Sequence, residues 1–173
     1  MIEILKNTTG NILELGCGEG STLVIREMIK NTNRKLVSLE SDFSWFNKYA
    51  HLADESHQLY HVNAGNDDTI ETGNIWVEFI KSMKLNDFEI VLIDSTPWAS
   101  RKLCFDYFLN KVKIVIFHDF DYFPVNNIIG HVVSSETYDG KVKITCDLDN
   151  VVKNYKLLYP PYRFLLVLLH HQR

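Results

Sequence analysis

The chain has 173 residues, with 18 Lys and Arg against 22 Asp and Glu, and its formal net charge is −4. A hydrophobic content of 46% and a charged content of 23% exclude collagen-like, low-complexity and largely disordered proteins. The length suits one domain spanning residues 1–173. The mildly acidic balance gives no general field that attracts nucleic acid or anionic membranes, so we expect neither as a partner.

The cysteines and the N-terminal segment indicate a cellular compartment. Cys17, Cys104 and Cys146 form neither a disulfide framework nor a zinc knuckle, and such sparse usage favours a reducing environment. No apolar run approaches the ~20 residues needed to cross a bilayer. The opening MIEILKNTTG lacks the basic and apolar regions of a secretory signal. We therefore expect a cytoplasmic protein.

Short β-branched runs alternate with stretches of helical spacing along most of the chain. The runs predict strands at residues 12–15, 35–40, 57–62, 88–94 and 112–118. Helical spacing predicts helices at 21–30, 43–53, 69–83, 98–109 and 124–133. This alternation is typical of βαβ units around a parallel sheet.

Two later strands, at 141–146 and 163–170, are expected to pair antiparallel at one edge of this sheet. The predicted fold class is therefore α/β: a Rossmann-like three-layer sandwich whose mostly parallel, seven-stranded sheet carries an antiparallel edge hairpin. Ligands in such sheets bind beyond the carboxyl ends of the strands. Polar residues follow all five predicted parallel strands, at positions 14–20, 40, 63, 94–98 and 118–121.

The loop ELGCGEG, residues 14–20, joins the first predicted strand to the first predicted helix. Glycines at alternate positions permit positive φ and let a ligand lie on bare backbone. A dinucleotide fingerprint would need glycine at position 21, where this chain has Ser21. The loop resembles the first motif of class I S-adenosylmethionine-dependent methyltransferases, E/D-x-G-x-G-x-G. The resemblance implies that Gly16, Gly18 and the neighbouring backbone hold the methionine part of the cofactor and that Glu14 helps to position it.

Glu40 ends the second predicted strand, where a carboxylate can accept hydrogen bonds from both ribose hydroxyls. In the family, such a residue does so. Ser41 departs from the apolar residue that often follows it, and Asn63 offers an amide for the adenine amine. The cofactor residues expected from the loop and the resemblance are Glu14, Gly16, Cys17, Gly18, Gly20, Ser21, Glu40, Ser41, Asn63, Ala64 and Asp94.

The fourth and fifth predicted strands, FEIVLID and VKIVIFH followed by Asp119, resemble those of small-molecule O-methyltransferases, including enzymes that act on sugars and natural products. The resemblance implies catalytic roles for Asp94, His118 and Asp119, and methylation of a hydroxyl on a small molecule or glycan. The segment DSTPW after the fourth strand also invites comparison with amino-methyltransferases. N-methylation and a non-catalytic S-adenosylmethionine-binding module stay open as alternatives.

Three interpretations of the reaction end remain open. Asp94 and Asp119 can hold Mg²⁺, which would stabilise the acceptor oxygen as an alkoxide. Alternatively, His118 acts as a metal-free base, because an imidazole has an unperturbed pKa near ~6.5. In the third interpretation, His118 is a core residue and Asp119 caps a helix. The short segment before residue 12 predicts an open site, with acceptor contacts from later segments or from the second subunit of a homodimer.

Overall fold

The computed structural model describes residues 1–67, 69–83 and 87–118, and the backbone of four later strands. The first part contains α1 (Ile2–Lys6), β1 (Asn11–Leu15), α2 (Thr22–Ile29), β2 (Leu36–Glu40), α3 (Phe43–Ala50), β3 (His57–His61), α4 (Ile70–Ser82), β4 (Phe88–Ile93), α5 (Trp98–Phe108) and β5 (Ile114–His118). The later strands are β6 (Val133–Tyr138), β7 (Lys141–Cys146), β8 (Tyr155–Leu158) and β9 (Leu165–Leu169).

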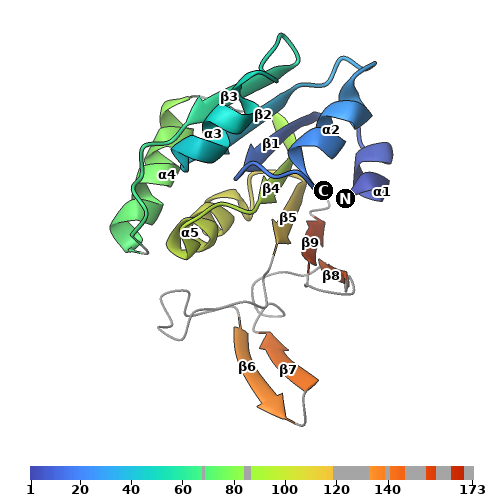
Figure 1. Cartoon of the computed structure of the whole chain (residues 1–173). Helices are drawn as coiled ribbons and strands as arrows, with labels where there is room; N and C mark the ends of the chain where they lie inside the picture. The colour runs from blue at the N-terminus through green and yellow to red at the C-terminus, as the bar shows by residue number, and fades with distance from the viewer. Residues whose placement is uncertain are drawn as a thin grey trace.

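Five strands, β3-β2-β1-β4-β5, pair in parallel and confirm the prediction of an α/β Rossmann-like fold (Figure 1). The strand order reverses at β1, which pairs with β2 on one side and with β4 on the other. In register, Leu15 lies opposite Leu39 of β2 and opposite Ile93 of β4. The carboxyl ends of these three strands therefore lie side by side, at the switch point where such sheets bind ligands.

Beyond β5 the sheet continues with antiparallel pairing, because β9 pairs with β5 and β8 pairs with β9. The expected pairing of residues 141–146 with 163–170 was wrong. β7 pairs instead with β6 in a separate two-stranded sheet (Figure 1). Asp139 and Gly140 are the two residues between β6 and β7, and Asp-Gly is a favoured two-residue hairpin connection. The helix expected at 124–133 lies outside the described residues except for Val133, which begins β6.

Side chains alternate between the two faces of the sheet and form a buried cluster on each face. Leu13 and Ile93 belong to the cluster that also contains Trp76 of α4 and Phe105 of α5. Ile12 and Leu92 belong to the other cluster, with Leu5 of α1 and Ile25 of α2. Helices therefore cover both faces of the parallel part of the sheet, as a three-layer sandwich requires.

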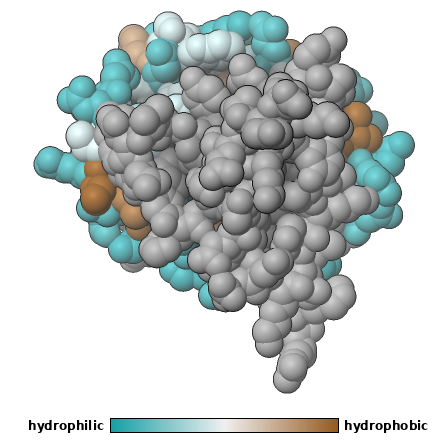
Figure 2. Space-filling view, turned by 90° about the horizontal axis from the view of Figure 1, so that it is seen from below, coloured by the Kyte–Doolittle hydropathy of each residue, from teal (hydrophilic) through white to brown (hydrophobic). Residues whose placement is uncertain are grey.

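Several boundaries differ from those expected. The helix expected at 43–53 ends at Ala50, and the strand expected at 112–118 begins at Ile114. Helix α1 was not predicted, because five residues carry too little periodicity to recognise. It is held by tertiary burial of Leu5. Polar side chains make up most of the described surface seen in Figure 2. Within the described residues, no helix is long and apolar enough to cross a membrane.

Candidate functional site

The glycine loop turns sharply as it leaves β1. Gly16 has φ +91°, and its N–H donates to the Leu39 carbonyl oxygen at 2.8 Å. A Cβ atom at this position would lie 2.4 Å from the carbonyl oxygen of Asp94. Only glycine accommodates both the positive φ and this close approach of β1 to the end of β4.

The loop then folds back over its own strand as α2 begins. The Gly18 N–H donates to Thr22 Oγ1 at 3.0 Å, and the Thr22 N–H donates to the Gly18 carbonyl oxygen at 2.9 Å. Ser21 precedes the helix, and its buried hydroxyl makes no hydrogen bond of normal geometry among the described residues, although it lowers the pKa of Glu14. The loop therefore presents backbone and the Ser21 hydroxyl beside the end of the sheet.

Glu14 is a fully buried carboxyl beneath this loop. Its Oε2 accepts hydrogen bonds from Thr22 Oγ1 at 2.9 Å and from Ser38 Oγ at 2.6 Å. Its Oε1 is buried and has no partner among the residues that the structure describes. Burial raises the pKa of Glu14 to about 7, although the neighbouring hydroxyls oppose the rise. A buried acceptor without a donor is costly, and a ligand that brings a donor would relieve that cost.

Glu40 ends β2 on the other side of the loop. Its Oε2 accepts a hydrogen bond from the Cys17 N–H at 2.7 Å, and its Oε1 accepts one from the Asp42 N–H at 2.8 Å. Burial raises the pKa of this carboxyl, and the amides partly offset the effect. Each oxygen keeps a further lone pair, so both can still accept from a ligand. Burial, with the nearby Glu14 and Glu40 carboxyls, raises the pKa of the Cys17 thiol, which is not a reactive thiolate.

The remaining predicted cofactor residues lie at the ends of β2 and β3. The Ser41 hydroxyl donates to the Thr96 carbonyl oxygen at 2.9 Å and thereby links the segment after β2 to the segment after β4. His61 lies against Phe43, with ring centroids 5.4 Å apart, and its Nε2 is 3.1 Å from the Ser41 carbonyl oxygen. Asn63 is exposed beyond β3, and the next residue, Ala64, is buried.

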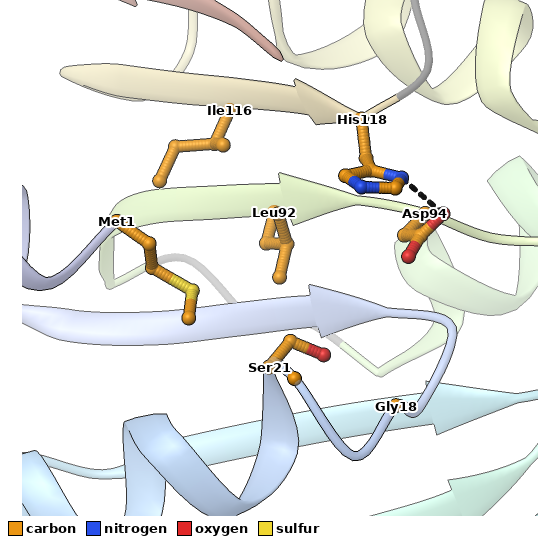
Figure 3. A pocket seen from close by; sticks show the side chains of 8 residues that line it. Met1, Gly18, Ser21, Leu92, Asp94, Ile116 and His118 are labelled. Atoms are coloured by element: carbon orange, nitrogen blue, oxygen red, sulfur yellow. Dashed lines mark ion pairs between the residues drawn. The ribbon is translucent and has the colours of Figure 1, made fainter. Parts of the chain in front are cut away.

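At the reaction end, Asp94 follows β4 and His118 is the last residue of β5. His118 Nδ1 lies 3.2 Å from Asp94 Oδ1 (Figure 3). Parallel pairing of β4 with β5, with Ile93 opposite Phe117, makes the two side chains neighbours. Asp119 lies outside the described residues, so its predicted catalytic and metal-binding roles remain predictions.

Arg101 of α5 was missed by the sequence analysis, although it organises the reaction end. The residue is 4% exposed, and its Nη2 pairs with Asp94 Oδ1 at 2.9 Å. Its Nε donates to the Ser95 carbonyl oxygen at 2.6 Å, and its Nη1 donates to the His118 carbonyl oxygen at 3.0 Å. The guanidinium also lies over the Trp98 ring, 4.1 Å from its centroid. The sequence signal that could have identified Arg101 is its place in a predicted helix most of whose residues are apolar.

A cavity of about 320 Å³ opens beside Asp94 and His118. Figure 3 shows Leu92 and Ile116 on adjacent strands as its apolar floor, with Ser21 and Gly18 across from them. Met1 lines the end away from the Asp94–His118 pair (Figure 3). A mainly apolar hollow with a few convergent polar groups is the usual form of a small-molecule site.

Asp94 does not suit a magnesium ion in this arrangement. Its Oδ1 already faces the Arg101 guanidinium at 2.9 Å and His118 Nδ1 at 3.2 Å. A divalent cation would have to displace or repel that buried positive charge. Among the described residues, no group of three or more His, Cys, Asp or Glu side chains is placed to hold a metal. We therefore derive no step through Mg²⁺.

Comparisons with known proteins identify the fold. No protein-family model and no curated protein match the sequence. Among solved structures, one assigned as a caffeoyl-CoA O-methyltransferase from Staphylococcus aureus matches with a TM-score of 0.54 and 11% identity, over 98% of this chain and 80% of that one. The methyltransferase domain of bacterial CtHen1-CN matches with a TM-score of 0.53 and 12% identity, over 98% and 95% of the two chains. The chain therefore has the class I methyltransferase fold.

Proposed function

We propose that the protein is an S-adenosylmethionine-dependent methyltransferase that acts on a hydroxyl of a small molecule or sugar. The observation that carries the proposal is the unpartnered, buried Oε1 of Glu14 at the switch point of a class I methyltransferase fold. Thr22 links this carboxyl to the Gly18 backbone of the loop, and the second carboxylate, Glu40, lies at the end of the adjacent strand.

The residues present fit the cofactor. Glu14 would accept from the ammonium of its methionine part, the Gly16–Gly18 backbone would lie along that part, and Glu40 would accept from the ribose hydroxyls. Ser41, Asn63 and Ala64 would border the adenine. When bound, S-adenosylmethionine supplies a methyl group already activated on a sulfonium. The protein's own task is to align the acceptor and to manage its proton.

The Asp94–His118 pair provides a route for that proton without a metal. With Nδ1–H directed at Asp94, His118 keeps a lone pair on Nε2 and can accept the proton of an acceptor hydroxyl. The Arg101 guanidinium pairs with Asp94 and holds it in place. His118 thus acts as the base and Asp94 orients it.

The cavity beside this pair supports a compact acceptor. A volume of about 320 Å³ lies at the lower end of the range typical of small-molecule sites. The Leu92 and Ile116 floor would pack against an apolar face of the acceptor, while its hydroxyl would point toward His118. A hydroxylated ring or a single sugar unit meets both requirements.

Calorimetric titration with S-adenosylhomocysteine, the demethylated product of the cofactor, tests the proposal. We expect saturable binding that Gly18→Val and Glu40→Ala abolish, because one fills the loop and the other removes the ribose acceptor. Glu27→Gln is the matched control, because this glutamate is 77% exposed on the outer surface of α2. A wild-type protein that shows no binding at millimolar ligand refutes the proposal.

The acceptor class is tested separately, by release of S-adenosylhomocysteine from S-adenosylmethionine in the presence of hydroxyl-bearing or amine-bearing compounds. Turnover with phenols or sugars supports O-methylation. Turnover with amines alone identifies an N-methyltransferase. Cofactor binding without turnover by any acceptor supports the alternative of a non-catalytic binding module.

A further inference from the structure

A continuous chain of polar side chains leads away from Glu14 beneath the sheet surface. Ser38 Oγ lies 2.6 Å from Glu14 Oε2 and 2.9 Å from His57 Nε2. His57 Nδ1 lies 3.0 Å from Arg26 Nη1. Arg26 in turn pairs through Nη2 with Asp54 at 2.8 Å, at the surface. The chain spans β1, β2 and β3: Glu14 lies opposite Ser38, and His57 lies opposite Leu36, two residues before Ser38.

The chemistry of arginine sets the direction of every hydrogen bond in this chain. A guanidinium has donors only, so His57 Nδ1 must accept from Arg26. A neutral imidazole that accepts at Nδ1 carries its proton on Nε2, so His57 donates to Ser38 Oγ. The Ser38 hydroxyl proton is then directed at Glu14 Oε2. With an ionised Glu14 and a neutral histidine, no other arrangement satisfies all three contacts.

The state of His57 agrees with this assignment. The residue is fully buried, and burial, together with the adjacent Arg26 charge, lowers the pKa of His57 to about 4. The imidazole is therefore neutral at physiological pH. The Asp54 carboxylate acts in the opposite sense, and its Oδ1 also accepts the His57 backbone N–H at 2.9 Å.

Thr22 completes the pattern at Glu14. Its Oγ1 accepts the Gly18 N–H, so its hydroxyl proton is free to point at Glu14 Oε2. Oε2 thus receives two donors, while Oε1 has none among the described residues. Besides burial, the Asp94 charge at the end of β4 raises the pKa of Glu14, and the hydroxyl donors lower it. Two donors on one oxygen leave the other oxygen open.

We propose that Arg26 and His57 are positioning residues that act through Ser38 to direct a hydrogen-bond donor at Glu14 Oε2, which leaves Oε1 open to the ammonium group of an amino-acid ligand. The inference rests on the proposed function, since the methionine part of the cofactor supplies that ammonium. His57 at the start of β3 and Arg26 in the middle of α2 thereby contribute to recognition of the ammonium charge, although neither residue contacts it.

The test compares two ligands that differ by one group: S-adenosylhomocysteine and its analogue in which hydrogen replaces the amino group. Ser38→Ala and Arg26→Met are expected to weaken binding of S-adenosylhomocysteine about tenfold, the effect of losing one hydrogen bond to a charged group. Binding of the deaminated analogue should change less than about twofold. Ser38→Thr keeps the hydroxyl and should restore affinity. Glu27→Gln is the control, because this exposed glutamate lies on α2 outside the polar chain.

The outcomes separate this inference from the proposed function. A wild-type protein that binds neither ligand ends both. A wild type that binds, with variants that weaken both ligands equally, shows a purely structural network and overturns the inference alone. Unchanged affinity in Ser38→Ala overturns it as well. Nitrogen-15 NMR of the wild-type His57 ring gives an answer that needs no variant: a neutral ring protonated at Nε2 supports the inference, and a ring protonated at Nδ1 refutes it.

Discussion

Replacing Arg101 by methionine tests whether one buried guanidinium holds the reaction end together. Methionine keeps much of the apolar volume of the side chain and removes the donors and the charge. The variant removes a donor from the Asp94 carboxylate and from the backbone carbonyls of Ser95, His118 and, at 3.4 Å, Asp94.

The contacts set the size of the effect. Each carbonyl that loses a buried donor costs about 1–3 kcal/mol. Asp94 is 31% exposed, so water replaces part of its lost ion pair, which contributes about 1 kcal/mol. Together the losses are about 4 kcal/mol, which corresponds to a fall of roughly 8–16 °C in Tm for a chain of this size.

Chemical denaturation followed by circular dichroism measures the free energy of unfolding. Lys102→Met is the matched control, since the neighbouring Lys102 forms an i,i+4 ion pair with Asp106 and its loss should cost less than about 0.5 kcal/mol. An Arg101→Met variant within 1 kcal/mol of the wild type, or no less stable than the control, would refute the role assigned to Arg101.

Three further predictions follow from the site. Gly16→Ala should lower the free energy of unfolding by more than about 2 kcal/mol, because its Cβ would lie 2.4 Å from the Asp94 carbonyl oxygen. Gly20→Ala is the control and should cost under about 1 kcal/mol, because nothing lies within 4 Å of its Cβ. Equal losses of stability for the two variants in urea unfolding would contradict this prediction. Between pH 4.5 and 7 the folded Glu14 keeps a proton that the unfolded chain has released, because its pKa is raised from 4.5 to about 7. As the pH rises across this window, the wild type should therefore lose about 3 kcal/mol of unfolding free energy relative to Glu14→Gln. Parallel curves of unfolding free energy against pH for the two proteins would refute this prediction. Asp94→Ala should keep S-adenosylhomocysteine affinity within about threefold and abolish turnover, so a variant with normal turnover removes Asp94 from the mechanism.

The sequence predicted the parallel part of the fold because each of those strands carries its own signal. Strand β4, for example, is a continuous apolar run ending in Asp94, and such a run predicts a strand buried on both faces. The glycine loop was equally readable, since spacing within seven residues defines it. The pairing of β7 with β6 was not predicted, because no strand was expected at residues 133–138 and the strand at 141–146 was therefore paired with the other late strand.

The partners of the site residues could not be predicted, because they come from distant parts of the chain. Arg101 is seven residues from Asp94, in the first turn of α5, but it reaches the His118 carbonyl only because β5 pairs beside β4. His57 and His61 are only four residues apart, yet His57 faces Ser38 and Arg26 while His61 lies against Phe43. Side-chain periodicity states which face a residue occupies, and only the assembled sheet determines what meets it there.

The carboxylates at the switch point differ in how their charge is balanced, and that difference divides their roles. Glu14 and Glu40 receive hydrogen bonds from hydroxyls and backbone amides, which are neutral donors. Asp94 faces a buried guanidinium. A buried carboxylate with only neutral donors remains costly, as the raised pKa values of Glu14 and Glu40 indicate.

A ligand that carries positive charge gains most where that cost is still unrelieved. The ammonium of an amino-acid ligand would therefore favour the open oxygen of Glu14 over Asp94, whose counter-charge the chain itself supplies. Because Asp94 is already balanced, it is suited to orienting His118 and poorly suited to binding a cation. The proposed cofactor recognition at β1 and β2 is thus distinct from the proposed proton transfer at β4 and β5, although all of these residues lie at one end of one sheet.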